Sequence, residues 1–139
     1  QHWLSQQQMD KEYLAIVTGE LPNDEGIIKA PIARKEGSII ERCVSENGKY
    51  AKTSYKLLAK RKGLSLLQVK LFTGRTHQIR VHMAYIGYPL FNDNLYGTPG
   101  PQSRHALHAF KLRFIHPVSD TPVEITRTLP EDLRRIIYY

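Results

Sequence analysis

The residues best suited to chemistry lie together in residues 73–82, where the sequence reads Thr-Gly-Arg-Thr-His-Gln-Ile-Arg-Val-His. A glycine turn precedes a helical pattern, and the first backbone N–H groups of a helix have no partner within it. The helix dipole also favours negative charge at that end. Arg75 and His77 add side-chain donors beside these amides, a combination typical of phosphate sites. The segment therefore predicts anion binding.

Arg80 follows His77 by three residues, so a helix would place both on one face. That face points away from the apolar stripe formed by Ile79, Met83 and Ile86. Arg80 is therefore either a site residue or a surface arginine whose aliphatic stem lies along the helix. The spacing alone favours neither interpretation.

Six histidines raise the alternative of a metal site. His77 and His82 are five residues apart, which does not suit one helix face. His105 and His108 are three apart in a segment that is only partly predicted as strand, where their side chains would point in opposite directions. No carboxylate accompanies either pair, so we expect no metal.

The formal net charge is +7, but the positive charge is concentrated in the middle of the chain. Residues 1–46 carry −3 and residues 117–139 carry −1. Residues 47–116 hold twelve basic side chains and a single acidic one, Asp93. This stretch favours a polyanionic partner, with nucleic acid as the first candidate. A basic face that only maintains solubility is the alternative.

The length of 139 residues and a hydrophobic content of 41% suit one globular domain. The single cysteine excludes an internal disulfide. No apolar run approaches the ~20 residues of a membrane span, and the start of the chain lacks a signal-peptide pattern. We therefore expect a cytoplasmic protein with no membrane association.

Strand patterns predominate along the chain. Tyr13 begins a short apolar run, and this pattern alone favours a half-buried structural aromatic. Asn47-Gly48 predicts a hairpin turn, and Lys62-Gly63 joins the two arms of the clearest hairpin. The predicted strands are residues 13–17, 27–33 with an edge or bulge at Pro31, 39–44, 51–60, 64–72, 106–115 and 123–128.

Two helices are expected among these strands. The first spans residues 76–86, with Thr76 as its N-cap and Gly87 just after its end. The second follows Pro130 and ends at residues 136–137. Strands that run and return with few helices predict an α+β fold with a mixed, mainly antiparallel sheet.

The motifs in this order closely resemble the RluA-type pseudouridine synthases, and the resemblance extends over essentially the whole chain. Residues 73–84 match the most specific motif of that family, and the Lys-Glu-Tyr-Leu-Ala run at residues 11–15 matches its tyrosine motif. The other matching segments are Pro31-Ile32, Gly48-Lys49, residues 51–53, Ile86-Gly87, Pro89-Leu90, Asp93, residues 95–97, residues 107–109, Phe114 and His116-Pro117.

The resemblance implies a pseudouridine synthase fold and the isomerisation of uridine in ribosomal or transfer RNA, without a cofactor or a metal. Arg80 matches the basic residue that pairs with the catalytic aspartate. Tyr13 matches the aromatic residue that stacks on the flipped base. Arg75, Thr76 and His77 would contact RNA, and Leu107 would form an apolar wall.

The catalytic aspartate of the family lies in a His-Arg-Leu-Asp motif before the tyrosine motif. Residues 1–10 do not match that motif, and Asp10 is in the wrong position. We therefore expect residues 1–139 to be the C-terminal part of a single catalytic domain that is inactive alone, with exposed apolar surface that causes it to associate. A non-catalytic RNA-binding module with this fold is the alternative, and a DNA-binding or ribosomal structural role is a third.

Overall fold

The computed structural model describes residues 10–97, 106–115, 122–126 and 130–138. Six strands form one sheet: β1 Asp10–Thr18, β2 Glu25–Lys29, β5 Lys52–Arg61, β6 Leu64–Leu71, β7 Leu107–Ile115 and β8 Pro122–Thr126. The other elements are β3 Ile32–Arg34, β4 Arg42–Val44, α1 Gln78–Tyr85 and α2 Glu131–Tyr138.

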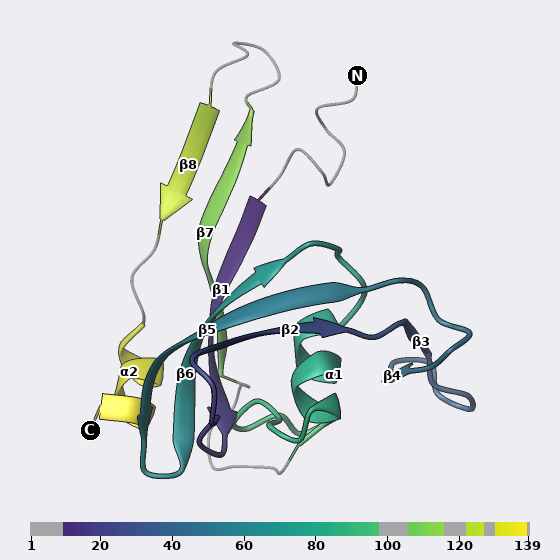
Figure 1. The fold of residues 1–139 in the computed structure, drawn as a ribbon, viewed down its shortest axis with the longest axis horizontal. Coiled ribbons are helices and arrows are strands. Elements are labelled where there is room, and N and C mark those ends of the chain that lie inside the picture. The colour runs from purple at the N-terminus through teal and green to yellow at the C-terminus, as the bar shows by residue number, and fades with distance from the viewer. Residues whose placement is uncertain (1–9, 98–105, 116–121, 127–129, 139) are drawn as a thin grey trace.

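The strand order in the large sheet is β2-β5-β6-β1-β7-β8, and β3 pairs only with β4 in a small second sheet (Figure 1). Every ladder between described strands is antiparallel. The structure therefore confirms the α+β fold and the mainly antiparallel sheet expected from the sequence.

The predicted hairpin around Lys62-Gly63 is confirmed and forms the middle of the sheet. Arg61 of β5 pairs with Leu64 of β6, so the loop contains two residues. Lys62 has φ 58° and Gly63 has φ 76°, which matches a type I′ turn. This turn matches the twist of the two strands that it joins.

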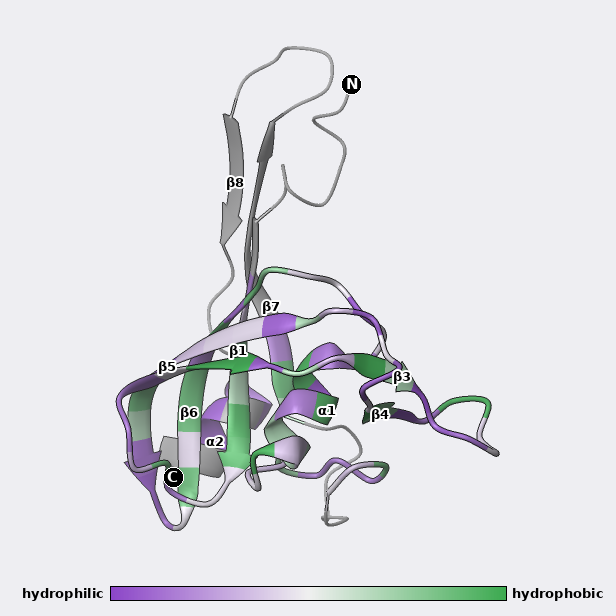
Figure 2. Ribbon diagram, turned by 45° about the vertical axis from the view of Figure 1, so that its right-hand side comes forward, coloured by the Kyte–Doolittle hydropathy of each residue, from purple (hydrophilic) through white to green (hydrophobic). Residues whose placement is uncertain are grey.

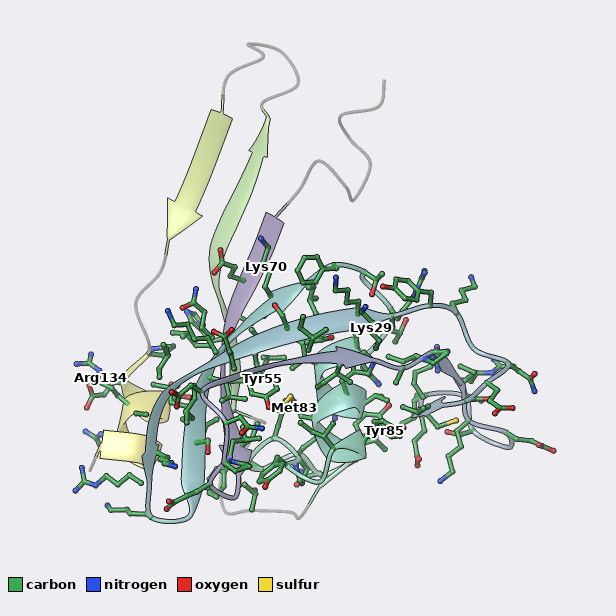
Figure 3. All side chains as sticks on the ribbon, in the orientation of Figure 1. Lys29, Tyr55, Lys70, Met83, Tyr85 and Arg134 are labelled. Carbon is green, nitrogen blue, oxygen red and sulfur yellow. The ribbon has the colours of Figure 1, made fainter. Side chains whose placement is uncertain are left out.

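The main core lies between the sheet and α1. Met83 is fully buried and faces Tyr55 of β5 across this layer, whereas Tyr85 on the same helix is 60% exposed (Figure 3). Ile79 is also buried, and Ile86 packs partly against the same cluster, so the predicted apolar stripe is confirmed. The remaining members of the cluster are mostly strand residues, namely Ala15, Val17, Leu21, Ile28, Ala30, Leu67, Val69 and Leu90.

A second apolar cluster buries another side of α1. Val81 packs with Ile32 of β3 and with Ala51, which precedes β5. The helix therefore lies between the sheet and the β3–β4 pair, and is not a surface helix with one polar face.

The predicted strand 27–33 is divided in the structure. β2 ends at Lys29 and β3 begins at Ile32, with Ala30 and Pro31 between them. Proline has no N–H to donate to a ladder, which accounts for the break at this position. β3 then pairs with β4 and not with the large sheet.

Only the last three residues of the predicted strand 39–44 form β4. Ile39 and Ile40 are 83% and 61% exposed in the loop before it, and Figure 2 shows the hydrophobic colour at the tip of this loop. The turn at Asn47-Gly48 exists, but it returns Lys49 to a bridge with Ile32 of β3. The strands before and after this turn, β4 and β5, therefore do not pair with each other.

The remaining predicted elements are confirmed with small changes of boundary. β8 begins at Pro122, and the predicted end of this strand at residues 127–128 lies outside the described residues. In α2, Glu131 pairs with Arg135 at 3.2 Å one turn later. No helix in the described part of the chain is long and apolar enough to cross a membrane.

Candidate active site

A cleft of about 360 Å³ opens beside the first turn of α1, between residues from β1, β6 and β7. We call it the α1 cleft. It is lined by Tyr13, Leu71, Arg75, His77, Gln78, Ile79, Arg80 and Leu107. Five of the six site residues expected from the sequence are therefore brought together here. Thr76, the sixth, lines a neighbouring groove instead.

Gln78 fixes the turn that leads into α1. Its Oε1 accepts hydrogen bonds from Thr73 Oγ1 at 2.7 Å and Arg75 N at 3.0 Å. Its Nε2 donates to Thr53 Oγ1 at 2.8 Å and Lys52 O at 3.0 Å. Because Gln78 is only 2% exposed, these bonds form away from water and hold the turn firmly against β5.

His77, and not Thr76, is the residue that precedes α1, so the predicted cap is wrong. His77 has φ 57° and ψ 24°, and no side chain caps the helix start. The chain turns tightly first, with Gln78 N donating to Arg75 O at 3.0 Å, which displaces the helix start by two residues. A left-handed non-glycine residue is strained, and such residues concentrate at functional sites.

A tyrosine fixes the ring of His77. Tyr96 Oη accepts from Arg42 N at 2.9 Å and forms a hydrogen bond of 2.7 Å with His77 Nδ1. Burial lowers the pKa of His77, and the positive charges of Arg80 and Arg42 lower it further. The neutral imidazole of His77 is therefore favoured near pH 7.

Arg80 forms a two-pronged ion pair with Asp93, which lies in the loop after α1. Nε donates to Oδ2 at 2.9 Å and Nη2 donates to Oδ1 at 2.8 Å. The Arg80 guanidinium also lies 5.1 Å from the centre of the Tyr96 ring. Nη1 has no hydrogen-bond partner within the described residues and remains available to a ligand in the α1 cleft.

Asp93 is fully buried, and both of its carboxylate oxygens accept hydrogen bonds. Its Oδ1 accepts from the backbone N–H groups of Leu95 and Tyr96 at 3.1 Å each, in addition to Arg80. Burial alone would raise the pKa of Asp93, but the hydrogen bonds from Arg80 and these two amides lower it overall. Asp93 is thus a permanently charged anchor for Arg80 and not an exposed nucleophile.

The other predicted site residues come from separate elements. Tyr13 of β1 is partly buried, and burial raises the pKa of its phenol, so the ring is neutral. A shift of register between Glu12 and Tyr13 marks a bulge against β7, a feature that redirects side chains. Arg75 Nε donates to Tyr50 O at 2.8 Å, which orients the guanidinium, and Leu107 starts β7 on the other side.

The sequence reasoning assigned no role to Asp93 or Tyr96. Asp93 had a detectable signal, because it is the only acidic residue among residues 47–116. A lone carboxylate in a strongly basic segment is a good candidate for a buried partner of one of the arginines. Tyr96 was indicated only as part of the matching segment 95–97, and nothing in the sequence predicted its contact with His77, nineteen positions away.

Metal chemistry has little support from the side chains. No group of three or more His, Cys, Asp and Glu residues that could hold a metal occurs in the described parts of the chain. His82 is fully buried between Thr53 Oγ1 and Ala30 O, at 2.8 and 2.9 Å, and faces the core. His105 lies outside the described residues.

Comparison with a protein-family model identifies residues 1–85 as an RNA pseudouridylate synthase. An uncharacterized RNA pseudouridine synthase of Bacillus subtilis, YjbO, is 41% identical over 91% of this chain and 45% of its own length. The ribosomal large subunit pseudouridine synthase D of Nitrosomonas europaea is 40% identical over 96% of this chain and 42% of its own length. The chain thus spans less than half the length of these relatives.

Solved structures show the same fold. Human RNA pseudouridylate synthase domain containing 1 matches with a TM-score of 0.80 and 28% identity, over 92% of this chain and 58% of that chain. Human RNA pseudouridylate synthase domain containing 4 matches with a TM-score of 0.71 and 20% identity, over 92% and 60% of the two chains. At that lower identity, the second match supports the fold alone.

Proposed function

The chain belongs to the RNA pseudouridylate synthase family, and we propose that the protein containing it converts uridine to pseudouridine in RNA at the α1 cleft. One observation carries this proposal. Tyr13, Arg75, His77, Arg80 and Leu107, which come from three separate parts of the sequence, line one cleft.

The proposed reaction is an isomerisation that adds and removes no atoms. The bond between a uracil nitrogen and ribose breaks, the base turns, and a ring carbon forms the new bond to the sugar. That carbon loses its proton and the released nitrogen gains one, so the composition is unchanged. Tyr13 stacks on the flipped base, and Leu107 provides an apolar wall opposite it. A neutral tyrosine ring suits this role because stacking needs no proton transfer.

The two basic positions of the cleft have different tasks in this proposal. Arg80 anchors itself on Asp93 and directs Nη1 towards the reacting sugar and the attacking carboxylate. A nearby cation keeps such a carboxylate ionised and oriented. Arg75 and the imidazole of His77 contact the phosphate of the flipped nucleotide, and Thr76 contacts RNA from the neighbouring groove.

The nucleophile is the component that the cleft itself lacks. No Asp or Glu side chain is among the residues that line it, and Asp93 is buried and fully engaged. We therefore assign the nucleophile to an aspartate outside the described cleft residues, as the resemblance to the RluA-type enzymes implies. Residues 1–139 alone, the C-terminal part of one catalytic domain, are expected to be inactive.

The substrate class follows from the relatives. Similar proteins include synthases named for the ribosomal large subunit, among them that of Nitrosomonas europaea, so ribosomal RNA is the first candidate and transfer RNA the second. Neither a cofactor nor a metal enters the proposed reaction. We propose a cytoplasmic location, because the name of the Nitrosomonas europaea relative refers to the ribosomal large subunit.

The complete protein tests this proposal. It is expressed in a strain that lacks the corresponding gene, and pseudouridines in cellular RNA are mapped by carbodiimide labelling and primer extension. We expect at least one site to appear with the wild-type protein and to disappear with Tyr13→Ala. If no uridine changes in any RNA despite soluble expression, the proposed activity is wrong.

A non-catalytic RNA-binding module is the second candidate. The observation that favours it is the absence of a carboxylate from the lining of the α1 cleft. Determining the true N-terminus of the cellular protein by intact mass separates the two proposals. A natural start at residue 1 would favour the binding module, and a longer protein with an upstream aspartate would favour the enzyme.

A further inference from the structure

A second hollow of about 510 Å³ adjoins the α1 cleft. We call it the β3–β4 groove, because one wall comes from β3, β4 and the turn after them. The other wall is the Gly74–Thr76 turn that precedes α1. Arg75 lines both hollows, so they meet at its guanidinium.

The groove is lined by cations and by no carboxylate. Arg34, Arg42, Lys49 and Arg75 all contribute to its surface. The side chains of Arg34 and Lys49 are exposed and have no hydrogen-bond or ion-pair partner in the described part of the chain. Arg75 Nε donates to Tyr50 O, and its two terminal amino groups have no hydrogen-bond partner among the described residues.

Two of these arginines oppose each other directly. Arg34 of β3 pairs in register with Arg42 of β4, which places both side chains on one face of the two-stranded ladder. Like charges directly opposite on a ladder are destabilising unless an anion lies between them. The loop ties Arg42 in place, since its Nη1 donates to Ile40 O at 3.2 Å and Ile39 O at 3.3 Å. The arrangement therefore suits a phosphate group.

A close backbone contact forms the floor of the groove. A Cβ atom added at Gly48 would lie 2.5 Å from the backbone carbon of Ile32, so only glycine allows the turn to lie this close to β3. At Gly74, by contrast, a Cβ atom would meet nothing within 4 Å. Thr76 is exposed at the same rim and provides a hydroxyl donor.

The groove is also connected to the α1 cleft by hydrogen bonds. Arg42 N donates to Tyr96 Oη, which is also hydrogen-bonded to His77 Nδ1 in the cleft. A ligand that moves β4 would therefore also move the ring of His77. This connection and the shared Arg75 make the two hollows one continuous surface.

We propose that the β3–β4 groove holds the single-stranded RNA backbone next to the flipped nucleotide, with Arg75 on the phosphate between the two hollows. The Arg34–Arg42 pair and Lys49 then bind the following phosphates. This inference rests on the proposed function, since it requires an RNA whose target base occupies the α1 cleft. It explains why Thr76 lies in the groove and not in the cleft.

The test removes two exposed charges from the groove and compares salt dependence. The complete protein carries Arg34→Gln with Lys49→Gln, and a matched control carries Lys60→Gln with Lys62→Gln at the β5–β6 turn. Binding of a fluorescent, uridine-containing single-stranded RNA is measured at 50, 100 and 200 mM KCl. Loss of two phosphate contacts lowers the magnitude of the slope of log affinity against log salt by about 1.4. Between 50 and 200 mM salt, the wild type should therefore lose about sevenfold more affinity than the variant.

The outcomes separate this inference from the proposed function. The groove pair should lower the slope, whereas the control pair and Tyr13→Ala should leave it unchanged. A groove variant with the slope of the wild type would overturn the inference, even if pseudouridine still forms. A lowered slope in a protein that forms no pseudouridine would support the groove and contradict the catalytic proposal. In a competition experiment, polyglutamate of the same total charge should displace the labelled RNA less well than unlabelled RNA does. Equal displacement by the two competitors would also overturn the inference, because the groove would then bind any polyanion.

Discussion

At the scale of single residues, the guanidinium of Arg80 has a structural role and a proposed catalytic role. Nε and Nη2 hold the buried carboxylate of Asp93, and Nη1 is left for the α1 cleft. Asp93 in turn organises the loop after α1 by accepting from two backbone amides. Arg80 is therefore a structural residue and a proposed catalytic residue at once, and experiments on it must separate the two effects.

Arg80→Ala should reduce turnover of the complete protein by about 10²- to 10³-fold, as loss of a positioned donor does. RNA affinity should fall only slightly, because one phosphate-type contact changes the salt slope by about one unit. The variant should also lose about 3 kcal/mol of stability, since Asp93 would be left buried without its cation.

Arg80→Ala combined with Asp93→Asn separates structure from catalysis. The amide keeps an oxygen for the loop N–H groups but carries no charge, so much of the stability should return in urea unfolding. Turnover should stay low, because Nη1 is still missing. If the double variant recovers activity together with stability, Arg80 has only a structural role.

His82 should make the fold sensitive to acid. Its ring is fully buried, and burial lowers its pKa from the ordinary value of 6.5. The unfolded chain therefore binds a proton more readily than the folded one, so stability is complete above pH 6.5 and falls below it. The expected loss approaches about 1.4 kcal/mol per pH unit.

His82→Gln should be less stable at pH 7.5 but show a flatter profile of unfolding free energy between pH 7.5 and 5.5 in urea unfolding. Parallel profiles for the two proteins would show that His82 does not cause the acid sensitivity.

At the scale of elements, the β3–β4 pair serves α1 and the groove together. Val81 of α1 packs on Ile32, and the same strand forms a wall of the β3–β4 groove. Sequence patterns predicted the large hairpin and the helix correctly because their signals are local, a Lys-Gly turn and an apolar stripe. They predicted neither the division of 27–33 into two strands nor the pairing of β3 with β4, since both depend on which distant strand is available.

Gly48→Ala should damage this pair selectively. The new methyl group would lie too close to the backbone of Ile32, and overpacking of this kind costs about 1 to 3 kcal/mol. Hydrogen exchange should therefore speed up in β3 and β4 but not in β1 and β6, and RNA affinity should fall although every cation remains. Gly74→Ala is the matched control, because it lines the same groove but has open space around it. Equal behaviour of the two variants would refute the role of the close contact.

At the scale of the whole molecule, the sheet has an exposed edge. β2 is the outer strand on one side, and Ile27 on it is 61% exposed. Unpaired edges with apolar side chains promote association between chains. Residues 1–139 should therefore sediment with a concentration-dependent coefficient, and Ile27→Lys should reduce this dependence. A monomer at all concentrations, for both proteins, would contradict the expectation.

The distribution of charge indicated where most of the residues that line the α1 cleft lie, but it indicated only part of the β3–β4 groove. The basic stretch 47–116 contributes β5, β6 and α1, and it supplies Arg75, His77 and Arg80 to the cleft. Arg34 and Arg42 of the groove lie in the acidic first third of the chain. The net charge of that segment therefore did not indicate that these arginines could bind an anion. Their importance follows only from the pairing of β3 with β4, which brings like charges into register.

Residues 1–139 alone should bind RNA but form no pseudouridine. The cations of the cleft and the groove are all contained in this chain, and electrostatic contacts of this kind dominate RNA affinity. Catalysis also requires a nucleophile, and the lining of the α1 cleft supplies no carboxylate.

The test measures RNA binding by anisotropy and pseudouridine by carbodiimide labelling, after circular dichroism has shown that the chain is folded. The complete protein is the positive control. Formation of pseudouridine by the chain alone would show that its own residues provide the nucleophile, and the role assigned to an upstream aspartate would be wrong.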